Sequence, residues 1–265
     1  MKARRTRASD DFQISKVRAA AAVSTEILQQ LVAAVEIGTT PRVIAKLADK
    51  LCQQQGVIPA FRGVAGARSK FSAPMCISVN DAVLHGLPTD EAIQDGDLVK
   101  LDFGIIKDGY YTDHCVTVGV GNVSAADLSL LKIGRLAVMT AASAAVSGKH
   151  TGDLGHTMQT IAETAGYQVL TDYVGHGIGR SLWQAPQIPA YGVPGSGELL
   201  EPGMVICVEA QVVAGSNEVF VDNDGWTVRT ADGSRGVMFE YMVLVGSGKP
   251  EILTKTMDLP LVVSK

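Results

Sequence analysis

Three acidic residues stand inside apolar stretches of sequence that have the length and composition of buried β-strands. They are Asp102 in the stretch 98–106, Glu209 in 205–213 and Glu240 in 237–245. An ionised carboxylate that is buried without a partner is costly, so each acid needs a cation, a proton or several hydrogen-bond donors. Basic residues are scarce here: Lys100 and Lys107 are the only ones near Asp102, and the other two stretches contain none. The fold must therefore supply a cation, a proton or several donors to these acids from elsewhere.

A fourth acid, Asp113, is connected to Asp102 by a β-hairpin that we predict over 97–118, where an Asp-Gly pair marks the turn. If the two-residue turn begins at Lys107, Asp113 lies directly opposite Asp102; if it begins at Asp108, the two are diagonal neighbours. Both registers place the carboxylates on one face, because strand side chains alternate with period two. Their Cβ atoms would then be about 4.5–8 Å apart. Two like charges this close favour a pair of divalent cations between them.

Histidine is the ligand type that the acids lack, and two of the histidines are candidates. His176 stands among small residues in the glycine-rich stretch 175–179, and His85 precedes a glycine. Small neighbours let a ligand or a backbone segment approach closely. The remaining histidines, His114, His150 and His156, are assigned structural roles. His114 is expected on the face of its strand opposite to that of Asp113.

The two halves of the chain have similar patterns. Apolar periodicity and capping residues predict helices over 12–36, from Thr40 to Gly56, over 124–147 and over 151–165, and strands over 75–79, 204–213, 218–223 and 235–246. In each half a strand carries an acid six positions after a glycine, Asp102 after Gly96 and Glu209 after Gly203. This favours an internal duplication with one site shared between the halves. We predict a basic N-terminal tail over 1–11 and one catalytic domain over 12–265.

Charge and cysteine usage exclude several kinds of partner. The net charge of −4 implies no DNA or other polyanion. The one basic cluster is interpreted as a solvated terminus, with a contact to ribosomal RNA as the alternative: Lys2, Arg4, Arg5 and Arg7. The four cysteines form no CxxC pair, and the sequence has neither a signal-peptide pattern nor an apolar stretch long enough to span a membrane. We therefore expect a cytoplasmic monomer with reduced cysteines.

Five of these residues resemble the metal-binding set of the methionine aminopeptidases: Asp102, Asp113, His176, Glu209 and Glu240. The resemblance extends over about residues 12–255 and includes the stretches 76–86, 107–109, 175–180, 202–204 and 224–228. It implies the pita-bread α/β (α+β) fold, in which pseudo-two-fold halves place helices outside a curved antiparallel sheet. The compact intervals between the last three ligands resemble the type I enzymes of bacteria.

The resemblance also implies roles for individual residues. Two divalent ions (Mn, Fe, Co or Zn) would bind the five ligands, and Glu209 would carry a proton from water to the leaving amine. His85 would hydrogen-bond the substrate, which is a peptide N-terminus whose methionine is removed when the second residue is small. The methionine side chain would lie in an apolar slot formed by Cys76, Leu182, Trp226 and Phe71.

One position departs from the family pattern. After the glycine-rich stretch the family usually has a second histidine that contacts the substrate carbonyl, and this chain has Trp183 there. An indole donates one hydrogen bond and carries no charge. Two alternatives therefore remain: an Xaa-Pro-type or other peptidase of the same fold, and a peptide-binding relative of low activity.

Overall fold

The computed structural model describes residues 11–263, so the basic cluster of the N-terminal tail lies outside the described residues. The chain opens with two helices, α1 (Asp11–Ala33) and α2 (Pro41–Gln55). Helix α2 begins where the sequence predicts, because the Thr40 hydroxyl accepts a hydrogen bond from the Val43 amide and Pro41 occupies the first turn. It ends at Gly56, whose φ of 63° suits the left-handed cap position.

The central sheet consists of two similar halves that meet at one seam. Its main order is β10-β9-β11-β14-β7-β4-β2. The bounds are β2 (Cys76–Val79), β4 (Leu98–Phe103), β7 (His114–Val120), β9 (Val174–Gly177), β10 (Gln184–Pro189), β11 (Val205–Val213) and β14 (Gly236–Leu244). Counted outward from the β7–β14 seam, one half runs β7-β4-β2 and the other β14-β11-β9. Strands β4 and β11, which carry Asp102 and Glu209, thus occupy equivalent places, as the sequence comparison of the halves predicted.

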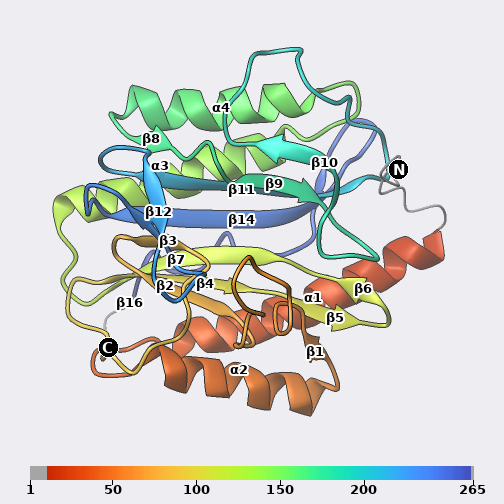
Figure 1. The fold of residues 1–265 in the computed structure, drawn as a ribbon. Coiled ribbons are helices and arrows are strands. Elements are labelled where there is room, and N and C mark those ends of the chain that lie inside the picture. Colours follow the sequence, from red (N-terminus) through yellow and green to blue (C-terminus); the bar gives the residue numbers. More distant parts are fainter. Residues whose placement is uncertain (1–10, 264–265) are drawn as a thin grey trace.

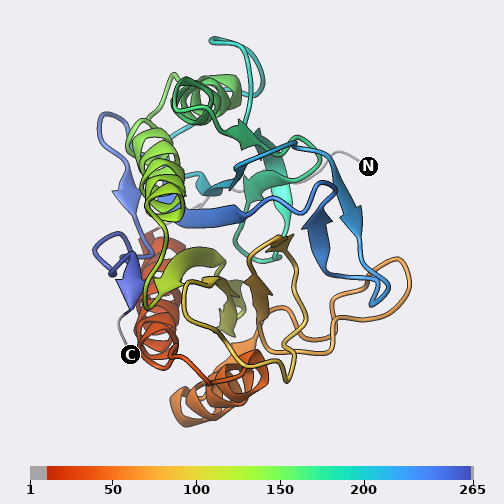
Figure 2. The same cartoon turned by 90° about the vertical axis from the view of Figure 1, so that its left-hand side faces the viewer.

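Helices cover one face of this sheet, and short strands and loops lie on the other side (Figures 1 and 2). Helix α1 packs on β4, whereas α3 (Ala125–Ser143) packs on β11 and β14, with α4 (Thr151–Thr164) beside it. A small separate sheet has the order β12-β13-β3, with bounds Val219–Val221, Val228–Thr230 and Ala82–Leu84. The remaining strands are β1 (Ile58–Pro59), β5 (Ile105–Lys107), β6 (Tyr110–Tyr111), β8 (Gln168–Val169), β15 (Glu251–Ile252) and β16 (Val262–Val263).

The hairpin between Asp102 and Asp113 has its turn at Asp108-Gly109. Both turn residues have positive φ, 51° and 77°, as a type I′ turn requires. Strand β4 accordingly pairs Asp102 with Cys115, so Asp113 is the diagonal neighbour of Asp102. The second of the two predicted registers is therefore the one observed.

Several elements differ from the prediction. The hairpin is interrupted near Thr112, whose hydroxyl accepts a hydrogen bond from the Ile105 amide, and its tip joins a separate small sheet. The short strands that lie outside the predicted ranges are β1, β3, β8, β9, β10, β13, β15 and β16. Each has six residues or fewer, which is too short for a clear periodicity. None of the described helices combines the length and apolar character needed to cross a bilayer.

Candidate active site

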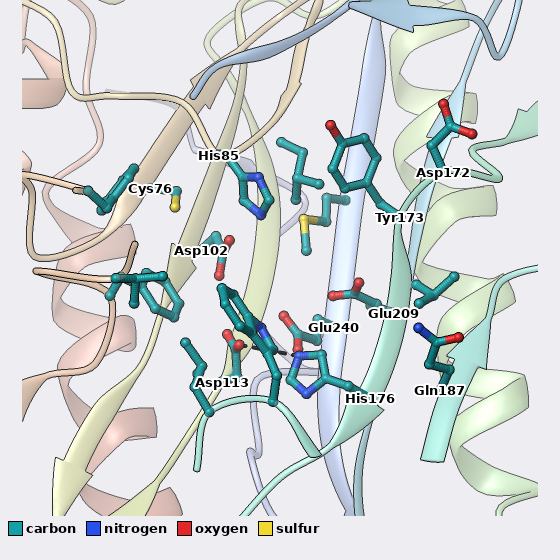
Figure 3. A pocket seen from close by; sticks show the side chains of 18 of the residues that line it. Cys76, His85, Asp102, Asp113, Asp172, Tyr173, His176, Gln187, Glu209 and Glu240 are labelled. Atoms are coloured by element: carbon teal, nitrogen blue, oxygen red, sulfur yellow. Dashed lines mark ion pairs between the residues drawn. The ribbon is translucent and has the colours of Figure 1, made fainter. Parts of the chain in front are cut away.

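Four acidic side chains gather on the sheet face that is opposite the helices (Figure 3). Glu209 on β11 lies directly across from Glu240 on β14. Glu240 in turn pairs with Cys115 across the seam, and Cys115 pairs with Asp102 on β4. Like charges directly opposite one another destabilise a sheet unless something neutralises them. The acids that the sequence singled out are thus brought together from both halves.

No lysine or arginine of the described part of the chain forms an ion pair with these acids. Lys100, which is 1% exposed, donates instead to the carbonyl oxygens of Asn80 at 2.6 Å and Gly236 at 2.8 Å. Burial lowers the pKa of Lys100 to about 7. Because its ammonium group fastens the turn after β2 to the start of β14, it does not compensate the carboxylates.

Burial raises the pKa of all four acids, and the charge of a neighbouring acid raises it further for Asp102, Glu209 and Glu240. Burial, together with the charge of Asp113, raises the pKa of Asp102 and of Glu240 well above the ordinary range. Burial raises the pKa of Glu209 to about 7 and also raises that of Asp113. Four carboxyl groups with raised pKa values in one place are stable only if protons or cations neutralise their charge.

His176 supplies the one nitrogen ligand of this group. Its Nδ1 lies 3.1 Å from the carbonyl oxygen of Gly177, which can only accept, so Nδ1 carries the hydrogen. The lone pair of Nε2 then faces the acids, 3.6 Å from a carboxylate oxygen of Asp113. Burial lowers the pKa of His176, but the Asp113 carboxylate, which attracts and would hydrogen-bond the protonated ring, outweighs this effect and raises the pKa overall. Fixing one ring nitrogen by a backbone carbonyl is a common way to orient a metal-binding histidine.

The donor atoms fit divalent metal ions. Donor atoms of Asp102, Asp113 and Glu240 lie within 4.8 Å of one another, and so do those of His176, Cys207 and Glu240. One oxygen of each of the three acids is buried without a hydrogen-bond partner among the described residues: Asp102 Oδ1, Asp113 Oδ1 and Glu240 Oε1. Carboxylate and imidazole suit Mn²⁺, Fe²⁺, Co²⁺ or Zn²⁺. Two adjacent donor groups that share Glu240 suit a pair of ions.

A cavity of about 530 Å³ opens onto these acids. Its walls include every residue predicted from sequence for substrate binding: Phe71, Cys76, His85, Leu182, Trp183 and Trp226. They also include residues that the sequence analysis did not identify, such as Asp172, Tyr173, Gln187 and Met238. Asp172 and Tyr173 lie within four residues of His176 in the sequence, and that proximity was the available signal.

His85 projects into the cavity from the turn after β3, in the left-handed region with a φ of 52°. Its ring makes edge contacts with Tyr173 and Trp226, at centroid distances of 5.6 and 6.4 Å. Burial lowers the pKa of His85 to about 4, so the ring is neutral near pH 7 and offers one donor and one acceptor. His176, by contrast, lies within strand β9, so the two candidate histidines are held by different kinds of element.

Aromatic residues form the apolar wall of the cavity. Trp226 packs edge-on against Phe71 at 5.0 Å, and its indole N–H donates to the Ser69 hydroxyl at 3.0 Å. Leu182 is buried, whereas Trp183 is 55% exposed.

His114 points away from the acids, as predicted, and its Nε2 lies 2.9 Å from the Ser24 hydroxyl on α1.

The close approach of Gly86 to β2 positions His85. A Cβ atom on Gly86 would lie 2.4 Å from the carbonyl oxygen of Ile77 and 2.6 Å from the Ser78 hydroxyl. We expect Gly86→Ala to lower the free energy of unfolding by about 1–3 kcal/mol, measured by urea denaturation. Gly248→Ala is the matched control, because no atom lies within 4 Å of its Cβ position. Equal stability of the two variants would contradict the close contact.

Comparisons with known proteins agree with this geometry. Residues 15–247 match the family described as metallopeptidase family M24. Methionine aminopeptidase 1 of Bacillus subtilis is 36% identical over 218 residues, which are 82% of this chain and 86% of that protein. The crystal structure of methionine aminopeptidase from Thermotoga maritima superposes with a TM-score of 0.90 at 35% identity, covering 96% of this chain and 99% of that one.

More distant structures share the fold alone. The prolidase from Pyrococcus furiosus superposes with a TM-score of 0.72 at 23% identity, and the match covers 93% of this chain but 65% of that one. The pita-bread arrangement predicted from sequence is therefore confirmed, and the similarity in sequence favours the aminopeptidases over the prolidases.

Proposed function

The chain belongs to metallopeptidase family M24, and from this membership we propose that the cavity removes the N-terminal methionine of peptides with a centre of two divalent metal ions. The observation that carries the proposal is the group of four buried acids, with one histidine and no lysine or arginine partner among the described residues. The chain is a metal-dependent aminopeptidase of the methionine type, as its relatives at about 35% identity over most of its length are.

The ions would be held by Asp102, Asp113, His176, Glu209 and Glu240. When bound, they supply Lewis-acid polarisation of the scissile carbonyl and make a nearby water more acidic. A pair of ions also neutralises the like charges that the strand pairing forces together. Glu240 belongs to both donor groups and is 1% exposed, so its carboxylate would help to hold the ions at both positions.

Glu209 and His85 would handle the protons and the peptide. Burial holds the pKa of Glu209 near 7, which suits a group that takes a proton from water and gives it to the leaving amine. The neutral ring of His85 can hydrogen-bond the peptide close to the scissile bond.

The apolar wall would hold the methionine side chain. Phe71, Cys76, Leu182 and Trp226 enclose one side of the cavity. Burial of a methionine side chain contributes about 1.5–3 kcal/mol, and its thioether makes favourable contacts with aromatic rings. This environment prefers an unbranched apolar side chain over a charged one.

The substrate assignment is tested with three peptides and metal-loaded protein. We expect Met-Ala-Ser to be cleaved with a higher kcat/KM than Met-Leu-Ser, because a small second residue fits beside the exposed Trp183 indole. Ala-Pro-Ala should be a poor substrate. Preference for Ala-Pro-Ala over Met-Ala-Ser would contradict the proposal and assign the chain to the Xaa-Pro-type peptidases.

Metal binding should stabilise the protein, whereas without metal the buried Glu240 carboxyl should destabilise it at high pH. Because the folded-state pKa of Glu240 is raised, its contribution to stability is present at low pH and is lost as the pH rises through that pKa. Glu240→Gln should therefore be more stable than wild type in metal-free buffer at pH 8. An ion at a hundred times its dissociation constant adds about 2.7 kcal/mol to the wild type.

Thermal unfolding with and without Mn²⁺ or Co²⁺ measures both effects. The wild type should gain stability on metal addition, and Glu240→Gln should gain much less. Glu218→Gln, which changes an exposed carboxylate on the surface, is the matched control and should behave as wild type. A metal-induced gain in Glu240→Gln equal to that of the wild type would remove Glu240 from the ligand set.

A further inference from the structure

The Cys207 thiol lies among the proposed metal ligands, although nothing in the proposed mechanism uses it. Cys207 precedes Glu209 by two positions on β11, so the two side chains share the face of the sheet that carries the acids. It is also the direct strand partner of His176 on β9. Direct partners place their Cβ atoms about 4.5–5.5 Å apart on one face.

The donor atoms around Cys207 converge on one point. Its Sγ, a ring nitrogen of His176 and a carboxylate oxygen of Glu240 all lie within 4.8 Å of one another. Glu240 Oε1 is buried and has no hydrogen-bond partner among the described residues, so this carboxylate is able to accept a further ligand. The second donor group, formed by Asp102, Asp113 and Glu240, contains oxygen atoms only.

The sulfur makes only weak contacts of its own. Cys207 is 0% exposed, and its thiol lies 3.8 Å from the Asp113 carbonyl oxygen and also interacts with the Glu240 carboxylate. A thiol is a weak donor, so these contacts are easily given up. Among the described residues, no other cysteine belongs to such a donor group. Cys52 lies in α2, whereas Cys76 and Cys115 are strand partners of the acids.

We propose that Cys207 Sγ is a ligand of the ion on the His176 side of the site, and that it makes this position selective for thiophilic ions. The inference rests on the proposed metal centre and adds a ligand to it. Binding replaces the sulfur–hydrogen bond with a sulfur–metal bond, and the proton leaves to solvent without any change of oxidation state. Thiolate ligands favour Zn²⁺, Fe²⁺ or Co²⁺ over Mn²⁺, so the two positions of the centre differ in metal preference.

Cobalt reports the contact directly. Wild-type protein is titrated with Co²⁺ under anaerobic conditions, and absorption is recorded in the near ultraviolet, where sulfur-to-cobalt charge transfer appears. We expect a charge-transfer band that saturates with the ion, is lost in Cys207→Ser and is kept in Cys52→Ser and Cys76→Ser. A variant that retains Cys207 as its single cysteine should keep the band, and it serves as the test even if Cys207→Ser does not fold.

Elemental analysis separates failure of this inference from failure of the metal centre. Full cobalt binding without the band, or a band that survives in Cys207→Ser, overturns the Cys207 ligand and leaves the centre in place. No cobalt binding to the wild type overturns both. In competition between Zn²⁺ and Mn²⁺, Cys207→Ser should reduce the preference for zinc by about tenfold or more; an unchanged ratio contradicts the proposal.

Discussion

Glu209→Gln is expected to lower kcat on Met-Ala-Ser by about 10²–10⁴-fold, the range typical of a lost general acid–base group. Glutamine has nearly the same shape as glutamate, and its carbonyl oxygen can still face the ions. Its amide cannot take a proton from water or return one to the leaving amine. The effect should therefore appear mainly in kcat, with a smaller change in KM.

The measurement combines steady-state kinetics with metal analysis of the same sample. Metal content near that of the wild type, together with the loss in kcat, assigns the defect to proton transfer. Glu218→Gln is again the surface control. If Glu209→Gln keeps kcat within about threefold of the wild type, Glu209 does not carry the proton, because general acid–base catalysis contributes much more than that.

Trp183→His is expected to change kcat in the opposite direction and to raise it on Met-Ala-Ser by up to about 10²–10³-fold. In the family that this chain resembles, the position holds a histidine that contacts the substrate carbonyl. Trp183 lines the same cavity as the acids and is 55% exposed, and we expect its bulk to narrow the place of residue two of a peptide. Histidine would restore a donor to the developing oxyanion and widen the site.

Trp183→Phe distinguishes the two possible effects of the indole. Phenylalanine removes the N–H donor and keeps an aromatic ring, so it should change kcat little if bulk is the limiting property. A loss of kcat in both Trp183→Phe and Trp183→His would show that the indole N–H is the working donor. Metal binding should stay at the wild-type level in both variants, since none of the proposed ligands is changed. Activity on Met-Leu-Ser measures the tolerance at residue two.

Local sequence was sufficient for the features that depend on neighbours along the chain. The acids inside apolar strands indicated a cation site because burying a charge is costly wherever the strand lies. Thr40, Pro41 and Gly56 placed helix α2, because capping is decided within one turn. The alternation of side chains placed Asp102 and Asp113 on one face and His114 on the other, whichever register the hairpin adopted.

The tertiary structure decided everything that depends on which strands become neighbours. The sequence left two registers open, and the positive φ angles at Asp108 and Gly109 selected one. Local sequence patterns did not predict that Glu209 pairs with Glu240, or Cys207 with His176, because those pairs join segments that are distant along the chain. Lys100 lay near Asp102 in sequence, yet it bonds to the carbonyls of Asn80 and Gly236. Periodicity reports which face of an element is buried, whereas contacts between elements depend on strand order, which only the folded chain defines.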